Sequence, residues 1–150
     1  MRNLATTVVC LATLSTTWHS AAARDLPDLV ITRADLQMTG NCSRGKPLLA
    51  GRVTVKNTGV GRAQIFTTRI MLRSNVIGRN DIAGADRFVN SMRPGEEVFV
   101  DVRLASSGQG PVAGLAGDYD IELSVDPLNV FRESNERNNT ARARVKINCP

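Results

Sequence analysis

Histidine and tryptophan are almost absent from this chain, which has one of each and three cysteines among its 150 residues. His19, Trp18 and Cys10 lie in the first 23 residues, a segment that we expect the mature protein to lose. Without a histidine, a serine or cysteine nucleophile lacks its usual general base. No glycine-rich phosphate loop follows a predicted strand. We therefore predict that the protein is not an enzyme and uses no cofactor.

The first 23 residues have the three parts of a secretory signal peptide. Arg2 supplies a positive charge, residues 4–17 are uncharged and mostly apolar, and residues 20–23 offer small side chains to a signal peptidase. The apolar run is shorter than the ~20 residues of a bilayer span. We predict cleavage after Ala23, export to the periplasm or the cell exterior, and no membrane span afterwards. A retained membrane anchor is the alternative.

Two cysteines, Cys42 and Cys149, remain after residue 23. In an exported protein, such a pair indicates a disulfide, which here would close a loop of about 107 residues. The chain-entropy model gives a loop of that length about 4–5 kcal/mol of stabilisation. Two free thiols are the alternative, and two thiols without histidine make a poor zinc site.

Alternation of apolar and polar residues is the main pattern of residues 24–150. This period of two is typical of strands with one buried face. It is clear at 52–56, 66–72, 98–104, 119–125 and 141–147, and weaker at 28–36 and 86–92. Turn-forming residues separate these segments, and no segment has a convincing helical period. We predict one all-β domain, an immunoglobulin-like antiparallel sandwich of about seven strands, with Tyr119 in its core.

Four segments also carry a family resemblance. They are PDLVI at 27–31, VTVKNTG at 53–59, RPGEE at 93–97 and GDYDIELSVDPLNVFRESNERNNT at 117–140. In this order and spacing they resemble the CARDB family, the cell-adhesion-related domain found in bacteria. The resemblance implies an immunoglobulin-like fold, an extracellular or envelope location, and a non-enzymatic binding or adhesion role. The cysteine pair is not part of the family pattern.

Acidic and amide side chains are concentrated between residues 126 and 139. Their oxygens are hard ligands that suit Ca²⁺, although the spacing is not that of an EF-hand. The calcium candidates are Asp126, Asn129, Glu133, Asn135 and Glu136. The alternative, which we favour, is that these side chains bond nearby backbone groups and stabilise a long turn.

Acidic and basic residues are concentrated on different predicted strands. Acids at 118, 120 and 122 should face bases at 142, 144 and 146 across a hairpin, with Arg69 and Arg73 approaching the acids from the other side. Most arginines then belong to a solvated sheet face. The candidates for binding an anionic envelope surface are less clearly matched: Arg79, Arg87, Arg93 and the out-of-phase Phe99. The chain lacks the aromatic platforms and basic runs expected of a nucleic-acid-binding protein.

The leading functional hypothesis is an exported binding module for a protein or glycan partner at the cell envelope. Loops 74–85 and 105–117 are the expected contact surfaces, because they are long and weakly patterned. One alternative is a structural subunit that assembles through exposed strand edges. The other is a calcium-dependent adhesin. The sequence leaves the partner and the oligomeric state open.

Overall fold

The computed structural model describes residues 25–39, 47–74, 83–105 and 117–148. These residues form seven strands and contain no helix. The strands are β1 (Leu29–Met38), β2 (Pro47–Asn57), β3 (Phe66–Ser74), β4 (Ala83–Val89), β5 (Glu97–Ala105), β6 (Gly117–Val125) and β7 (Thr140–Ile147). The all-β prediction is confirmed, and so is the number of strands.

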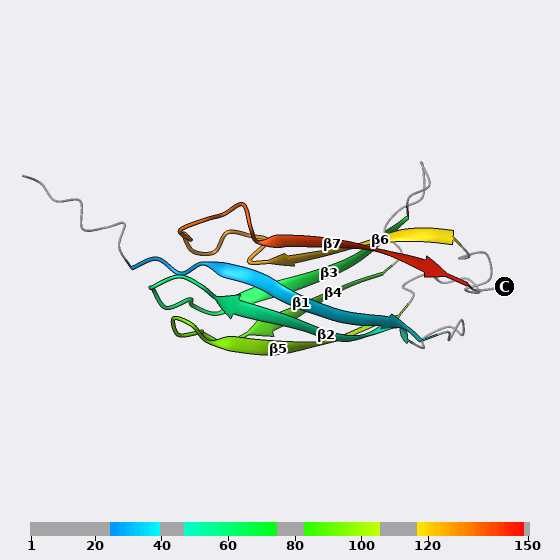
Figure 1. The fold of residues 1–150 in the computed structure, drawn as a ribbon, viewed down its shortest axis with the longest axis horizontal. Helices are drawn as coiled ribbons and strands as arrows, with labels where there is room; N and C mark the ends of the chain where they lie inside the picture. The colour runs from blue at the N-terminus through cyan, green and yellow to red at the C-terminus, as the bar shows by residue number, and fades with distance from the viewer. Residues whose placement is uncertain (1–24, 40–46, 75–82, 106–116, 149–150) are drawn as a thin grey trace, which may run out of the picture.

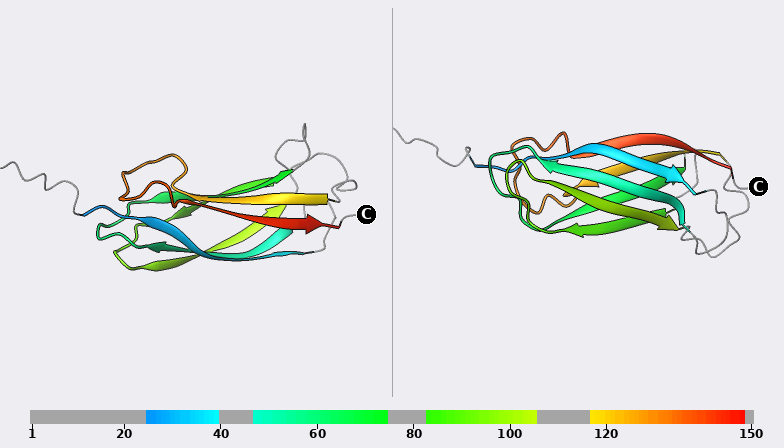
Figure 2. Two further views of the ribbon diagram at one scale, coloured as in Figure 1. Left: turned by 45° about the horizontal axis from the view of Figure 1, so that its top comes forward. Right: turned by 60° about the horizontal axis from the view of Figure 1, so that its bottom comes forward.

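The strands form two antiparallel sheets that pack face to face (Figure 1). One sheet has the order β1-β2-β5 and the other has the order β4-β3-β6-β7. The edge strands therefore meet in pairs on the two sides of the sandwich, β1 beside β7 and β4 beside β5. Figure 2 shows β4 and β5 along one common side in its right-hand view.

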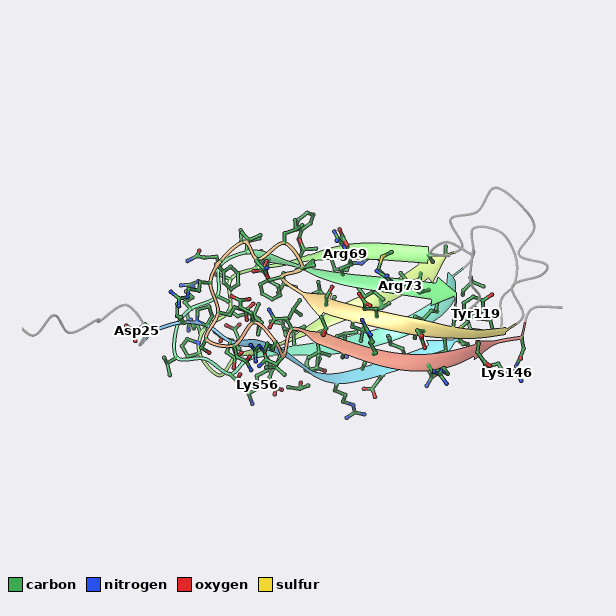
Figure 3. All side chains as sticks on the ribbon, turned by 90° about the horizontal axis from the view of Figure 1, so that it is seen from above. Asp25, Lys56, Arg69, Arg73, Tyr119 and Lys146 are labelled. Carbon is green, nitrogen blue, oxygen red and sulfur yellow. The ribbon has the colours of Figure 1, made fainter. Side chains whose placement is uncertain are left out.

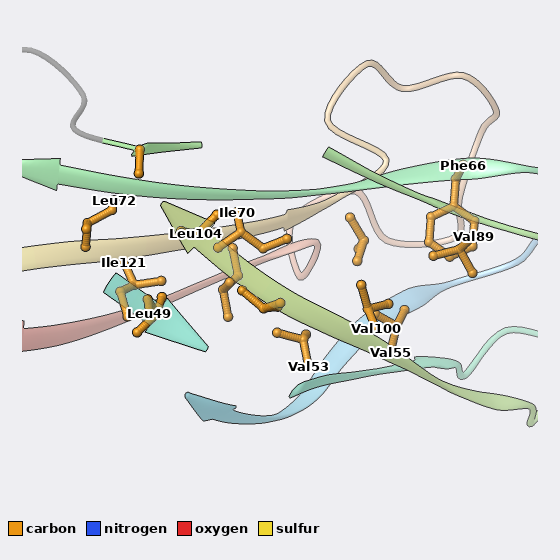
Figure 4. Close-up of a cluster of buried hydrophobic side chains, with 14 of the residues drawn as sticks. Leu49, Val53, Val55, Phe66, Ile70, Leu72, Val89, Val100, Leu104 and Ile121 are labelled. Atoms are coloured by element: carbon orange, nitrogen blue, oxygen red, sulfur yellow. The ribbon is translucent and has the colours of Figure 1, made fainter. Parts of the chain in front are cut away.

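The inward positions of the strands fill the space between the sheets (Figure 4). On β3 and β6, every second residue is buried, as the alternation predicts. Tyr119 is 1% exposed and belongs to this core, which confirms its predicted position. The described core contains no tryptophan, and aliphatic side chains supply most of its volume. Those most fully buried include Leu29, Leu49, Ile70, Leu72, Ile121 and Leu123.

Several strand boundaries differ from the sequence prediction, and β2 begins at Pro47, five residues before the predicted segment 52–56. β1 continues two residues further, to Met38, because Gln37 and Met38 still pair with Ala50 and Leu49 of β2. The fourth strand occupies 83–89 instead of 86–92. It begins early because small residues at 83–85 pair with β3 without an apolar pattern that the sequence could reveal. Met92 instead forms an isolated bridge with Ala63.

The chain enters the sandwich at residues 25–28, where two loops hold its backbone. The amides of Gly61, Ser134 and Thr58 donate to the carbonyls of Leu26, Pro27 and Asp28, at 3.0, 2.8 and 2.7 Å respectively. A Cβ at residue 61 would lie 1.8 Å from the carbonyl oxygen of Asp25. Only glycine therefore fits where this loop crosses the entering chain.

Asn57 fixes the same end of the sandwich from inside. Its side chain is fully buried, and its Oδ1 accepts hydrogen bonds from the amides of Asp28 and Gly59, both at 3.1 Å. Its Nδ2 donates to the carbonyl of Gly61 at 2.8 Å and to that of Met92 at 3.4 Å. One amide side chain thus satisfies backbone groups of Asp28, Gly59 and Gly61 that strand pairing leaves open. It adds a second bond to the Met92 carbonyl, which already accepts from the Ala63 amide.

Candidate functional site

A groove of about 520 Å³ runs along the side of the sandwich where β4 meets β5. Its apolar floor consists of Val89 and Val100, which are buried, and Val98, which is partly buried. The remaining lining residues are Arg87, Phe88, Asn90, Ser91, Glu96, Phe99 and Asp101. Both walls are edge strands of the described sheets, in which β4 pairs with β3 and β5 pairs with β2.

Two phenylalanine rings border this groove. Phe88 is 83% exposed and Phe99 is 65% exposed, in each case because the side chain points to the outer side of its strand. The Arg52 guanidinium lies 5.2 Å from the centre of the Phe99 ring and pairs with Asp101 at 3.2 Å. Such a cation–π contact orients the ring while its other face stays accessible. Apolar and aromatic side chains thus make up half of the groove lining, and polar or charged side chains make up the other half.

Arg87 lies on the inner side of β4. It is opposite Thr68 in the antiparallel register, and Thr68 is fully buried. Its side chain is half-buried, and its Nη1 donates to the carbonyl of Asp86 at 3.0 Å. The two carboxylate oxygens of Asp86 are already bonded by Arg69, both at 2.9 Å. That hydrogen bond is the main reason why the pKa of Asp86 falls below its ordinary value.

The structure brings together two of the four predicted binding residues. Arg87 and Phe99 share the groove, whereas Arg93 borders a neighbouring depression with Arg62, Ser91 and residues 94–96. Arg79 lies outside the described residues, as do most of the two loops that were expected to form contacts.

Phe88 is a groove residue that the sequence reasoning missed. Two apolar residues in succession, Phe88 and Val89, suggested only a buried segment. The alternation along the strand could have revealed it. Every second residue of a strand points to the same side, and Phe88 falls on the side of Gly84 and Asp86, which point outward from β4.

Four of the five calcium candidates accept hydrogen bonds with their side chains in the β6–β7 loop, and Asn129 donates its backbone amide to the Asp126 carbonyl. Asp126 accepts from the amides of Val130 and Phe131, Asn135 from the amide of Arg137, and Glu136 from the amide of Glu133. Asp126 and Asn129 both have positive φ, as turn residues often do. Among the described residues, no group of three or more acidic, cysteine or histidine side chains could hold a metal ion.

Glu133 is the most unusual of these side chains. It is 3% exposed, and its carboxylate accepts hydrogen bonds from the Leu29 amide at 2.5 Å and from Asn139 Nδ2 at 2.8 Å. Burial is the main reason why its pKa rises to about 7, against the lowering effect of the Leu29 amide. This carboxyl group joins the loop to the first residue of β1.

The outer face of the larger sheet carries a ladder of ion pairs. Arg73 and Arg142 approach Glu122 from either side, at 3.6 and 3.1 Å, and Arg144 lies 3.5 Å from Asp120. The predicted pairing of β6 acids with β7 bases is confirmed for these residues. Arg69 pairs with β4 instead of β6, because Asp86 is directly opposite it in the register. Figure 3 shows Arg69 and Arg73 together on β3.

Cys42 and Cys149 lie outside the described residues, so their disulfide remains a prediction. Figure 1 shows β1 and β7, the strands that precede the two cysteines, ending at the same end of the sandwich. The described residues also contain no helix with the length and apolar character that a membrane crossing requires.

The sheet order, the register and the shared core define an immunoglobulin-like β-sandwich. The sequence model of the CARDB family matches residues 26–143. The chain therefore belongs to the CARDB family. No curated protein matches it.

Two examples illustrate the solved structures that share this fold. The first is the CARDB domain of a Pyrococcus furiosus protein in complex with di-metal ions, with 23% identity and a TM-score of 0.56. The match covers 81% of this chain and 94% of that domain. The second is a domain assigned to a cell surface protein of Methanosarcina acetivorans, with 22% identity and a TM-score of 0.52. It covers 81% of this chain and 91% of that domain.

Proposed function

We propose that this chain is an exported, non-catalytic binding module that contacts a protein or glycan partner at the cell envelope through the β4–β5 groove. The observation that carries the proposal is the pair of exposed rings, Phe88 and Phe99, beside an apolar floor. Exposed apolar surface grouped at a groove is typical of interaction sites, whereas scattered apolar residues are not.

Export is supported by the predicted signal peptide and by membership in the CARDB family. The cell surface assignment of the Methanosarcina acetivorans domain points in the same direction. Periplasm and cell exterior both agree with these observations.

A non-catalytic role is supported by the placement of the acids. Residues 24–150 contain no histidine, and Asp118 and Asp120 lie on the solvated sheet face, where Arg144 pairs with Asp120. Glu133 is engaged by Leu29 and Asn139. General acid–base catalysis needs a titratable group within reach of a substrate, and these carboxylates are either solvated or enclosed.

The experiment that tests the proposal compares three forms of the protein in a pull-down from cell-envelope extract under mild cross-linking. The groove variant is Phe88→Ser with Phe99→Ser. The control is Leu128→Ser with Val130→Ser, which removes apolar side chains of similar exposure from the β6–β7 loop. Thermal unfolding by circular dichroism checks that all three forms are folded.

We expect the wild type and the loop control to recover the same partner and the groove variant to lose it. Equal recovery by all three forms would place the contact elsewhere. Failure of the folded wild type to recover any partner would argue against a binding function.

The structural-subunit alternative has one supporting observation, the open edges of β4 and β5. The other two edges are less suited to pairing with a further strand. Arg142, Arg144 and Lys146 project from β7, and a register shift interrupts β1 between Ile31 and Arg33. Basic side chains and bulges protect strand edges from association. An assembly subunit would self-associate in sizing experiments, whereas the binding module would remain monomeric without its partner.

A further inference from the structure

The chemical class of the ligand can be inferred from the charges in the β4–β5 groove. Two carboxylates line it, and both are engaged: Glu96 accepts from the amide of Arg93 at 2.6 Å, and Asp101 pairs with Arg52. Arg87 is the lining cation, and it forms no ion pair with any described carboxylate. Its one hydrogen bond within the described residues goes to the adjacent backbone carbonyl of Asp86.

Arg87 differs in this respect from most basic residues of the sheet faces, although Arg103 on β5 also forms no ion pair with a described carboxylate. Arg33, Arg52, Lys56, Arg69, Arg142 and Arg144 each pair with a carboxylate. A guanidinium group has five N–H donors in a planar fork that matches a carboxylate. Arg87 therefore brings a positive charge with open donors to a half-buried position above an apolar floor. A carboxylate on the ligand would complement that charge.

The walls of the groove indicate the form of the ligand. The outer edges of β4 and β5 have no strand partner among the described residues, so alternate N–H and C=O groups along each edge are open to an incoming chain. An extended peptide can pair with such an edge, and every second side chain then points to the same side. A glycan lacks this regular series of donors and acceptors.

We propose that the groove binds an extended peptide segment of a partner protein, with an acidic side chain against Arg87 and an apolar side chain two positions away over Val98 and Val100. The Phe88 and Phe99 rings border the same segment. This inference rests on the proposed function and adds the class of partner: an acidic, apolar strand that joins the edge of β4 or β5.

The test is a selection from a phage-displayed library of random twelve-residue peptides on the purified wild-type protein, without counter-selection, so that peptides that do not depend on Arg87 are retained. The selected peptide and its variant with the acid replaced by its amide are then synthesised, and their binding is measured by fluorescence anisotropy. Arg103→Gln is the matched control. Arg103 is an exposed arginine on the outer face of β5 and forms no ion pair with a described carboxylate.

We expect the selected peptides to share an Asp or Glu with an apolar residue two positions away. Arg87→Gln should weaken binding about 10- to 100-fold, as should the amide peptide, because a charge-assisted hydrogen bond contributes that much to affinity. Arg103→Gln should change the affinity less than about twofold. Added salt should weaken binding to the wild type more than to Arg87→Gln.

Four results would overturn the proposal. Peptides without an acid, or peptides that bind Arg87→Gln as tightly as the wild type, would remove the role of Arg87. Self-association of Arg87→Gln in sizing runs, without selected peptides, would show that Arg87 protects the edge of β4 from pairing. Binding of oligogalacturonate, an acidic glycan, in the absence of any selected peptide would assign the groove to glycans. Binding of this glycan would leave the proposed function in place, because the groove would still bind an envelope partner. If the groove variant recovered the same partner as the wild type in the pull-down, both the proposed function and the peptide inference would be wrong.

Discussion

Glu133 makes the stability of this domain depend on pH in a direction opposite to that of most carboxylates. Its pKa in the folded protein is about 7, against an ordinary value of 4.5. Between these values the folded state holds a proton that the unfolded state releases, so stability must fall as pH rises. The contribution of the protonated carboxyl is fully present below about pH 4.5 and is lost above about pH 7.

The size of the effect follows from the same two values. A pKa that rises from 4.5 to about 7 corresponds to about 3 kcal/mol over the full titration. Most of this, about 2–3 kcal/mol, falls between pH 5 and pH 8. For a domain of this length, that is a decrease of roughly 10 °C in melting temperature.

The pH window from 5 to 8 isolates this group. Residues 24–150 contain no histidine, so no imidazole titrates there. Asp86, whose pKa is lowered by the hydrogen bond from Arg69, contributes stability that is lost only as the solution becomes more acidic than this window. Glu133 should therefore dominate the slope of stability against pH.

The assay is urea unfolding at pH 5, 6, 7 and 8, followed by far-ultraviolet circular dichroism, because residues 24–150 contain no tryptophan. The perturbation is Glu133→Gln, which keeps the shape of the side chain and cannot ionise. We expect the wild type to lose stability toward pH 8 and the variant to be flat. Glu97→Gln, which removes an exposed carboxylate paired with Lys56, is the control and should retain the wild-type slope.

The reasoning would be refuted by a wild-type stability that is constant or rises from pH 5 to pH 8. A slope that persists unchanged in Glu133→Gln would equally refute it. A free energy of unfolding that is lower in Glu133→Gln by the same amount at every pH would not refute it. The amide replaces one acceptor oxygen by a donor, and this change affects stability equally at all pH values.

Three further predictions concern the ends of the sandwich. Asn57→Ala should lower the free energy of unfolding by about 3 kcal/mol, since it leaves the amides of Asp28 and Gly59 and the carbonyl of Gly61 without their side-chain partner; denaturant unfolding measures this, and a loss below 1 kcal/mol would contradict it. Under non-reducing conditions, peptide mapping should find Cys42 linked to Cys149, and Cys149→Ser should lower the melting temperature; two free thiols would disprove the disulfide. Millimolar Ca²⁺ should leave the melting temperature unchanged, because Asp126 and Glu133 already accept hydrogen bonds; a clear rise would favour the calcium-dependent adhesin instead.

Much of the fold could be predicted because strand patterns are local. The side chains at 66, 68, 70 and 72 face the core as their alternation predicts, and so do those at 119, 121, 123 and 125. The predicted bounds were wrong where the alternation was weak. β4 begins at Ala83 because backbone pairing with β3, and not side-chain hydrophobicity, defines this strand. The partner of Arg69 was mistaken for the same reason, since register decides which acid lies opposite.

The candidate site was less predictable, because its residues come from strands of different sheets. Phe99 and Arg87 each stood out in the sequence, yet nothing in it indicated that they border one groove. That depends on the sheet order, which places β4 and β5 at edges on the same side. Phe88 became visible as a binding residue only once its strand had a defined inner and outer face.

The sequence by itself determined the strand faces, the core side chains and the turn-forming character of residues 126–139, because these follow from alternation and from the local chemistry of short polar side chains. The tertiary structure decided which edges stay open and what Glu133 does. Its pKa depends on burial against the Leu29 amide, 104 residues away in the chain, and no local pattern can encode that contact. Packing of two sheets, and not the order of residues alone, produced both the groove and the buried carboxyl group.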